Sequence, residues 1–212
     1  MGYSGDTSQQ TDPKVLYLIS LFGNTIEGVD EEGKPVMIDR FIKEMPLLCL
    51  IYEAIVREIL DYDYAPKSIT ITNFRRFANV SQEGVDDIND LRELDLIEKI
   101  QLTTKHYTII NGYRITEKGR KVLPNIEPHE KAAIDKMCHC EVCGSLMDLK
   151  MVLNEKKNLS YAEDEEAIFE EDEIEFWMVC GEDMKHPQYQ SSFLDVEDVS
   201  YICYPFFLRD ID

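Results

Sequence analysis

Cysteine residues are concentrated in the last third of this chain, where their spacing is typical of a metal site. Five of the six follow residue 137, namely Cys138, Cys140, Cys143, Cys180 and Cys203. The segment Cys140-Glu-Val-Cys143-Gly144 has the form of a zinc knuckle, a tight turn that presents two thiolates to one ion while the glycine relieves the backbone. We therefore expect zinc at Cys140 and Cys143, with Cys180 as a third ligand.

The fourth ligand of such a site stays open between Cys138, His139 and His186. A ribbon that packs without metal is the alternative, because a second knuckle would need a cysteine at the position of Trp177, and the indole would then fill the vacated site. Disulfides are not expected, since the N-terminal segment lacks an apolar secretory leader.

Two β-prone runs flank these cysteines, at residues 146–153 and 175–180. Nine acidic residues lie between Glu163 and Glu175 and predict a solvated loop. The aromatic residues 199–208 predict a final strand, or an exposed docking segment. This layout resembles a zinc ribbon, from which Trp177 is the departure.

Acidic side chains gather on one predicted helix. Ser81 is a good N-cap, and the helix after it places Val85, Ile88, Leu91 and Leu94 on one side. The opposite side carries a set of acids at helical spacing: Glu83, Asp86, Asp87, Asp90 and Glu93. Only one base, Arg92, lies between residues 82 and 95. We expect a solvated face or a docking face for a basic protein, because each DNA phosphate would meet a like charge.

The segments around this helix predict a strand at 69–72, helices at 74–80 and 82–94, strands at 96–100 and 107–115, and a helix at 117–123 capped by Thr116. With the phrases Leu94-Asp-Leu-Ile-Glu and Tyr113-Arg-Ile-Thr-Glu-Lys-Gly-Arg, this order resembles the winged-helix fold of many microbial regulators over residues 46–123. In DNA-binding members, the helix corresponding to 82–95 enters the major groove. Nucleic-acid contact here would be left to a basic wing side: Arg75, Arg76, Lys99, Lys105, Arg114, Lys118, Arg120 and Lys121.

The preceding segments predict additional helices. Asp12-Pro13 starts a helix that ends near Gly23, with a strand as the rival. A turn at 30–33 leads to a second amphipathic helix at 34–44. Residues 46–59 form the first helix of the winged-helix core, and the upstream helices pack on it or form a homodimer interface.

Composition and charge restrict the class of protein. The 212 residues are 44% hydrophobic and carry a net charge of −20, of which −15 lies in residues 127–212. Such a surface repels nucleic acid and membranes and attracts basic partners. No nucleophile–base pair, Gly-rich phosphate loop or His-Glu hydrolase motif occurs, so we do not expect an enzyme. No apolar run is long enough to span a bilayer, and we expect a soluble intracellular protein.

The sequence thus predicts an α+β chain: a tail at 1–11, a winged-helix domain with N-terminal helices at 12–123, a linker helix at 124–137 and an acidic β module at 138–212. We interpret it as a non-enzymatic interaction subunit or adaptor of a larger assembly. Two alternatives remain. One is a transcription-associated factor, since the layout is similar to the large subunit of the archaeal and eukaryotic general transcription factor E. The other is an acidic mimic of nucleic acid.

Overall fold

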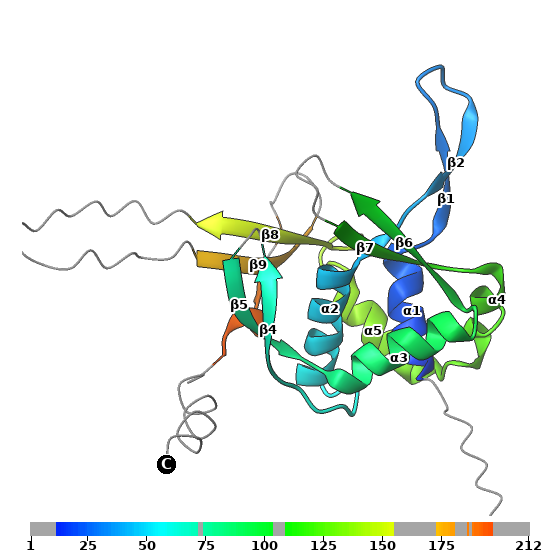
Figure 1. Cartoon of the computed structure of the whole chain (residues 1–212). Coiled ribbons are helices and arrows are strands. Elements are labelled where there is room, and N and C mark those ends of the chain that lie inside the picture. Colours follow the sequence, from blue (N-terminus) through cyan, green and yellow to red (C-terminus); the bar gives the residue numbers. More distant parts are fainter. Residues whose placement is uncertain are drawn as a thin grey trace, which may run out of the picture. The chain divides into compact units, whose positions relative to one another are not determined.

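The computed structural model of the chain describes residues 12–71, 74–103, 109–154, 173–180, 186 and 188–196 (Figure 1). The predicted tail at 1–11, most of the acidic loop, the aromatic segment 199–208, Cys203 and Lys105 lie outside them. The fold mixes helices and strands, which confirms the α+β class. Among the described helices, none is long and apolar enough to cross a membrane.

The chain divides into two compact units. The first comprises residues 1–63 and 81–137, and the second comprises residues 64–80 and 138–212. The second unit therefore takes a segment from the middle of the chain as well as the C-terminal part. Each unit is described below by itself.

In the first unit, α1 (Pro13–Phe22) is followed by a hairpin of β1 (Thr25–Val29) and β2 (Pro35–Asp39), the short β3 (Ile42–Lys43) and α2 (Glu44–Val56). After the segment that belongs to the second unit, α3 (Gln82–Glu93), β6 (Ile97–Thr103), β7 (Ile109–Ile115), α4 (Glu117–Arg120), the 3-10 turn η1 (Leu123–Asn125) and α5 (Pro128–Cys138) complete it. β3, β7 and β6 form one antiparallel sheet in that order.

The helix boundaries follow from local capping. Asp12 accepts a hydrogen bond from the Lys14 N–H at 2.9 Å, and Pro13 occupies the first turn, as the sequence predicts. Ser81 and Thr116 cap α3 and α4 in the same way, through the N–H groups of Gly84 and Gly119. Three helix starts read from the sequence are thereby confirmed.

Apolar faces of α1, α2 and α3 build the core of the first unit. α1 contributes Val15, Leu16, Leu18 and Ile19, all fully buried, and so belongs to the core. From α3, Ile88 and Leu91 are buried, whereas Leu94 lies just after the helix and is 45% exposed. The predicted apolar stripe is thus correct at its centre and wrong at its end.

The predicted helix at 34–44 is wrong, because these residues form β2, β3 and the first residue of α2. The turn before these residues explains why they form a strand and not a helix. Gly33 has a φ of +78°, and the Asp30 carboxylate accepts hydrogen bonds from the Glu32 and Lys34 N–H groups. This turn reverses the chain, so that Pro35–Asp39 pairs with Thr25–Val29.

The predicted helix at 74–80 is also wrong. These residues form β5 (Phe74–Val80), which pairs along its whole length with β4 (Ala65–Ile71). A run of seven residues with a few apolar positions does not distinguish helix from strand by periodicity. In the folded chain, buried Asn79 donates to the Asp195 carbonyl at 3.0 Å, which ties this hairpin to the C-terminal part of the second unit.

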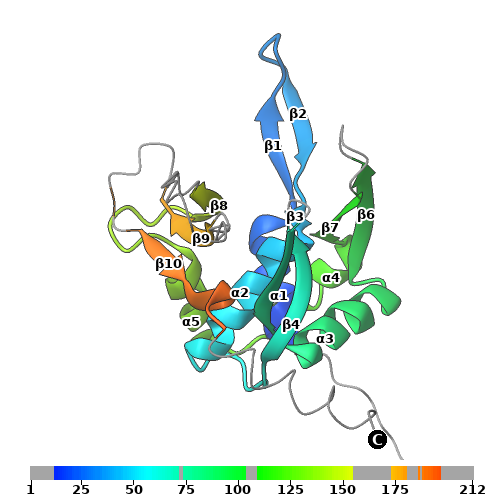
Figure 2. The ribbon, with the colours of Figure 1, turned by 60° about the vertical axis from the view of Figure 1, so that its left-hand side comes forward.

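The second unit contains that hairpin and a sheet of β8 (Asp148–Asn154), β9 (Glu173–Val179) and β10 (Tyr189–Ser191), in the order β10, β9, β8 (Figure 2). The 3-10 turn η2 (Ser192–Leu194) follows β10. Its Phe193 is fully buried and meets the ring of Phe176 edge-on, with centroids 5.7 Å apart. The two predicted β runs of the C-terminal module are therefore confirmed as strands.

Candidate metal centre

A tight hairpin presents the first two candidate ligands. The Met147 N–H donates to the Cys138 carbonyl and the Cys140 N–H to the Ser145 carbonyl, both at 2.8 Å. Inside this frame the Gly144 N–H closes onto the Cys140 carbonyl at 2.8 Å, and Gly144 has a φ of +72°. A left-handed glycine directly after Cys143 is what a knuckle requires, because it lets the chain turn back while both thiols point to the same side.

Strand pairing brings the other two ligands to this hairpin. Asp148 is paired with Val179, so Cys180 follows β9 at the end of the sheet where the knuckle enters β8. His186 lies in the connection between β9 and β10. The antiparallel order of the sheet thus brings together residues 37 positions apart in sequence.

Four donor atoms from Cys140, Cys143, Cys180 and His186 lie within 4.8 Å of one another. The Sγ atoms of Cys143 and Cys180 are 3.2 Å apart. The His186 Nδ1 lies 3.2 Å from the Cys180 Sγ and 3.5 Å from the Cys140 Sγ. Zinc–sulfur bonds of about 2.3 Å in a tetrahedron place ligand atoms about 3.8 Å apart. The group therefore has the dimensions of a tetrahedral metal site, and its donors could hold a metal ion.

The thiols interact strongly with one another. Hydrogen bonds from the Ser145 hydroxyl and N–H, and then from Cys180, lower the pKa of Cys143 to about 6. The hydrogen bond with Cys143, followed by burial, raises the pKa of Cys180 to about 12. Between protein groups alone, one thiolate thus forms at the expense of its neighbour. A divalent cation would allow all three to ionise, because its charge offsets theirs.

The structure chooses among the fourth ligands that the sequence left open. His186 joins the three cysteines, whereas Cys138, buried in the last turn of α5, is not part of the group. His139 forms a β-bridge with Leu146 and also lies outside it. The second pair of candidate ligands is Cys180 and His186, separated by five residues, so four donors gather without the cysteine that a second knuckle would place at position 177. The Trp177 indole instead donates to the Glu175 carboxylate at 2.7 Å.

The acidic residues of α3 differ in their exposure and in their hydrogen bonds. Asp86 and Glu93 are exposed, as predicted. Asp87 is half-buried and accepts a hydrogen bond from the Tyr62 hydroxyl, and burial raises the pKa of its carboxyl group. Glu83 accepts from the Asp63 N–H at 2.7 Å, and Asp90 is partly buried. The face predicted to be solvated is therefore only partly exposed, because Asp87 is hydrogen-bonded to Tyr62 and Asp90 is partly buried.

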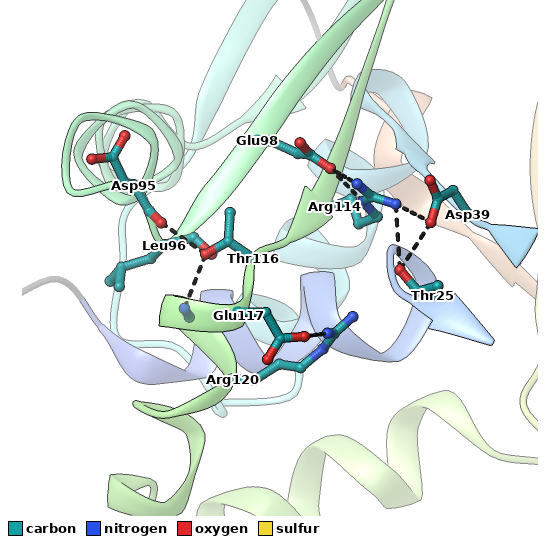
Figure 3. Close-up of polar contacts among 10 residues, drawn as sticks. Thr25, Asp39, Asp95, Leu96, Glu98, Arg114, Thr116, Glu117 and Arg120 are labelled. Carbon is teal, nitrogen blue, oxygen red and sulfur yellow. Dashed lines mark hydrogen bonds and ion pairs between the residues drawn. The ribbon is translucent and has the colours of Figure 1, made fainter. Parts of the chain in front are cut away.

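Cations on the predicted wing side of the first unit are engaged by neighbouring groups (Figure 3). Arg114 forms ion pairs with Asp39 and Glu98, and Arg120 forms one with Glu117. Lys118 donates to the Leu94 carbonyl at 2.7 Å. Arg76 belongs to the second unit, on β5. Two cations of the predicted basic side, Arg114 and Arg120, are thus paired with acids in the described part of the first unit.

A protein-family model described as "Uncharacterized protein MJ1567 family" matches residues 11–178, which is most of the chain. The chain belongs to the MJ1567 family. The matched range contains Cys140 and Cys143 and ends two residues before Cys180, so the family match covers the knuckle but not the second ligand pair. Neither the curated proteins nor the solved structures contain a match to this chain.

Proposed function

We propose that the chain is a non-enzymatic interaction subunit or adaptor whose second unit is held by a structural zinc ion. The observation that carries this proposal is the four-donor group of Cys140, Cys143, Cys180 and His186. Catalytic zinc sites use three protein ligands and keep a fourth position for water or substrate, whereas structural sites are closed by four. Three thiols and one imidazole complete the shell and suit zinc, because soft sulfur ligands favour it.

The first unit is then the platform that docks to a partner, and we propose that it is a winged helix. The order α1, β3, α2, α3, β6 and β7, with β7 central in the sheet, supports this assignment. In this reading α1 is the first helix of the core, in place of residues 46–59, and the β1–β2 and β4–β5 hairpins are insertions. The acidic surface of α3 occupies the position of the recognition helix, which disfavours groove binding and favours a basic protein.

The docking role of α3 is tested with its exposed acids only. A variant carrying Asp86→Asn and Glu93→Gln should bind partner proteins several-fold more weakly, because both carboxylates face solvent and steer basic surfaces. The measurement is affinity capture with the full chain as bait, followed by mass spectrometry and elution with salt. We expect basic proteins that elute as the salt concentration rises.

Glu58→Gln with Glu127→Gln is the matched control, since it also removes two exposed acidic charges from the first unit while leaving α3 unaltered. Equal capture by the α3 variant and the unaltered chain would contradict the docking role. Retention of the purified chain on DNA or heparin would instead favour the transcription-associated alternative, which the winged-helix order followed by a metal module also fits.

A further inference from the structure

The β1–β2 hairpin projects away from the helices of the first unit as an arm (Figures 1 and 2). Its strands pair only with each other within the described residues, in the register Thr25 with Asp39 through Val29 with Pro35. Neither strand thus has a strand partner on its outer edge in the part of the chain that the structure describes. An isolated two-stranded hairpin is at best marginally stable in water.

The two faces of the arm differ. On one face Ile38 lies over Gly28, where an added Cβ would be 2.4 Å from the Ile38 Cδ1 atom. This face is partly covered by the arm itself. The other face, which we call the docking face, consists of Glu27, Val29, Pro35 and Met37, because residues paired across the hairpin point to the same side. Val29 and Met37 are 67% and 64% exposed.

The base of the arm is fixed to the first unit. Arg114 on β7 pairs with Asp39 of the arm and with Glu98 of β6 (Figure 3). Its guanidinium also stands 4.9 Å from the centre of the Phe41 ring. Thr25 donates to Asp39 at 2.9 Å, and the Arg40 N–H donates to the Asn24 carbonyl at 2.8 Å. The arm is thus anchored at one end and presents its apolar residues beyond the anchor. A preorganised element of this kind loses little conformational entropy on binding.

Charge indicates which occupant fits the docking face. Glu27 lies opposite Met37 in the middle of it, and the turn adds Asp30, Glu31 and Glu32. Lys34, in the same turn, is paired with Glu32 at 2.5 Å. A second copy of this chain, with a net charge of −20, would bring like charges together. A surface with apolar and basic side chains complements both the exposed apolar side chains and the negative charge of the docking face.

We infer that the arm docks an extended, basic segment of a partner protein, with apolar side chains against Val29 and Met37 and cationic side chains against Glu27 and the turn acids. An extended segment also satisfies the unpaired strand edges by β-augmentation. The inference rests on the proposed adaptor function and gives it a second, separate contact surface from α3.

The test uses the full chain and a fluorescent peptide with the repeat Val-Thr-Lys-Thr, which places valine and lysine on the same face of an extended strand, as the docking face requires. A peptide with the repeat Val-Thr-Glu-Thr is the charge control. Fluorescence anisotropy measures binding at low ionic strength. We expect the lysine peptide to bind and the glutamate peptide not to bind. Amide exchange in residues 25–39 should slow when the lysine peptide is added, because the strand edges become hydrogen-bonded.

Two variants address the arm while preserving its shape. Val29→Thr with Met37→Gln keeps side-chain size but removes the apolar surface, and should weaken binding about tenfold. Glu27→Gln with Glu31→Gln should weaken binding and reduce its salt dependence. Ile109→Thr is the matched control, because Ile109 is 63% exposed on β7, and should leave binding unchanged.

The outcomes separate this inference from the proposed function. Loss of peptide binding in the Asp86→Asn, Glu93→Gln variant, but not in the arm variants, would overturn the inference that the arm binds the peptide and leave the adaptor role intact. No binding of the lysine peptide, or equal binding of both peptides, would also overturn it. A dimer in light scattering that the Val29→Thr, Met37→Gln variant dissociates would show that the occupant is a second copy.

Discussion

At the scale of single residues, polar side chains of the first unit form hydrogen bonds with residues that are far away in the sequence. Glu44 accepts hydrogen bonds from Asn111 at 2.7 Å and from the Tyr113 hydroxyl at 2.9 Å. Tyr62 donates to Asp87 across 25 positions. Such pairs cannot be read from helix periodicity, because they depend on where separate elements meet. For this reason the sequence predicts the acids of α3 but not which of them are engaged.

Tyr62 gives a prediction with a defined dependence on pH. Burial, followed by the hydrogen bond to Asp87, raises the pKa of Tyr62 above the ordinary value of 10.0. Above that pH the unfolded chain loses this proton while the folded chain keeps it. The contribution to stability is therefore complete below pH 10 and declines as the pH rises beyond it.

Urea unfolding of the unaltered chain and of Tyr62→Phe, compared between pH 9 and pH 11, measures this decline. The unaltered chain should lose more stability, by less than about 1.4 kcal/mol per pH unit, which is the limit for one proton. The partial exposure of the phenol lowers the value further. Parallel declines in the two proteins would show that Tyr62 does not carry the effect.

At the scale of elements, the sequence is most informative where one residue starts or ends a helix. Asp12, Ser81 and Thr116 define α1, α3 and α4 because each cap acts within a few residues of itself. The predictions fail for β2 and β5, where a short apolar run fits helix and strand equally well. For β2, the turn at Asp30 and Gly33 was visible in the sequence and predicts a hairpin when it is given more weight than the periodicity after it.

The candidate metal ligands also divide into those that a local motif predicts and those that depend on strand pairing. Cys140 and Cys143 could be predicted because their spacing and the following glycine form a local motif. His186 could not be chosen over Cys138, since the choice depends on the pairing of Asp148 with Val179 and on the position of β10. A cysteine and a histidine separated by five residues at the end of a strand are the signal that would have favoured it.

The anchor of the arm is a second prediction at this scale. Arg114→Met keeps the apolar stem but removes both ion pairs, so amides at the base of the arm, such as Thr25 and Arg40, should exchange about tenfold faster. In Arg114→Lys these amides should exchange at a rate between those of the unaltered chain and Arg114→Met, because lysine keeps the charge but not the planar guanidinium. Native-state hydrogen exchange with fragment separation measures this, with α1 as the internal reference. Unchanged exchange at the base of the arm would mean that backbone pairing alone holds it.

At the scale of the whole molecule, a net charge of −20 is distributed over two units with different means of stabilisation. The first unit has a core of three helices and a sheet. The second has two small groups of strands and, in our proposal, a metal ion that contributes directly to folding. A strong chelator should therefore unfold β8, β9 and β10, so that the strand contribution to the circular dichroism spectrum is lost while the helical signal of α1, α2 and α3 stays. Loss of the strand and helical signals together would contradict the division of stability between the units.

The most direct test of the central claim is the zinc content of protein purified without chelators, measured by inductively coupled plasma mass spectrometry against protein concentration. We predict about one equivalent of zinc in the unaltered chain and in Cys138→Ala, and less than about a tenth of an equivalent in Cys140→Ser and in His186→Gln, because three ligands hold the ion far more weakly than four. Less than about a tenth of an equivalent in the unaltered chain would contradict the structural zinc site, and full zinc in His186→Gln would contradict the ligand set.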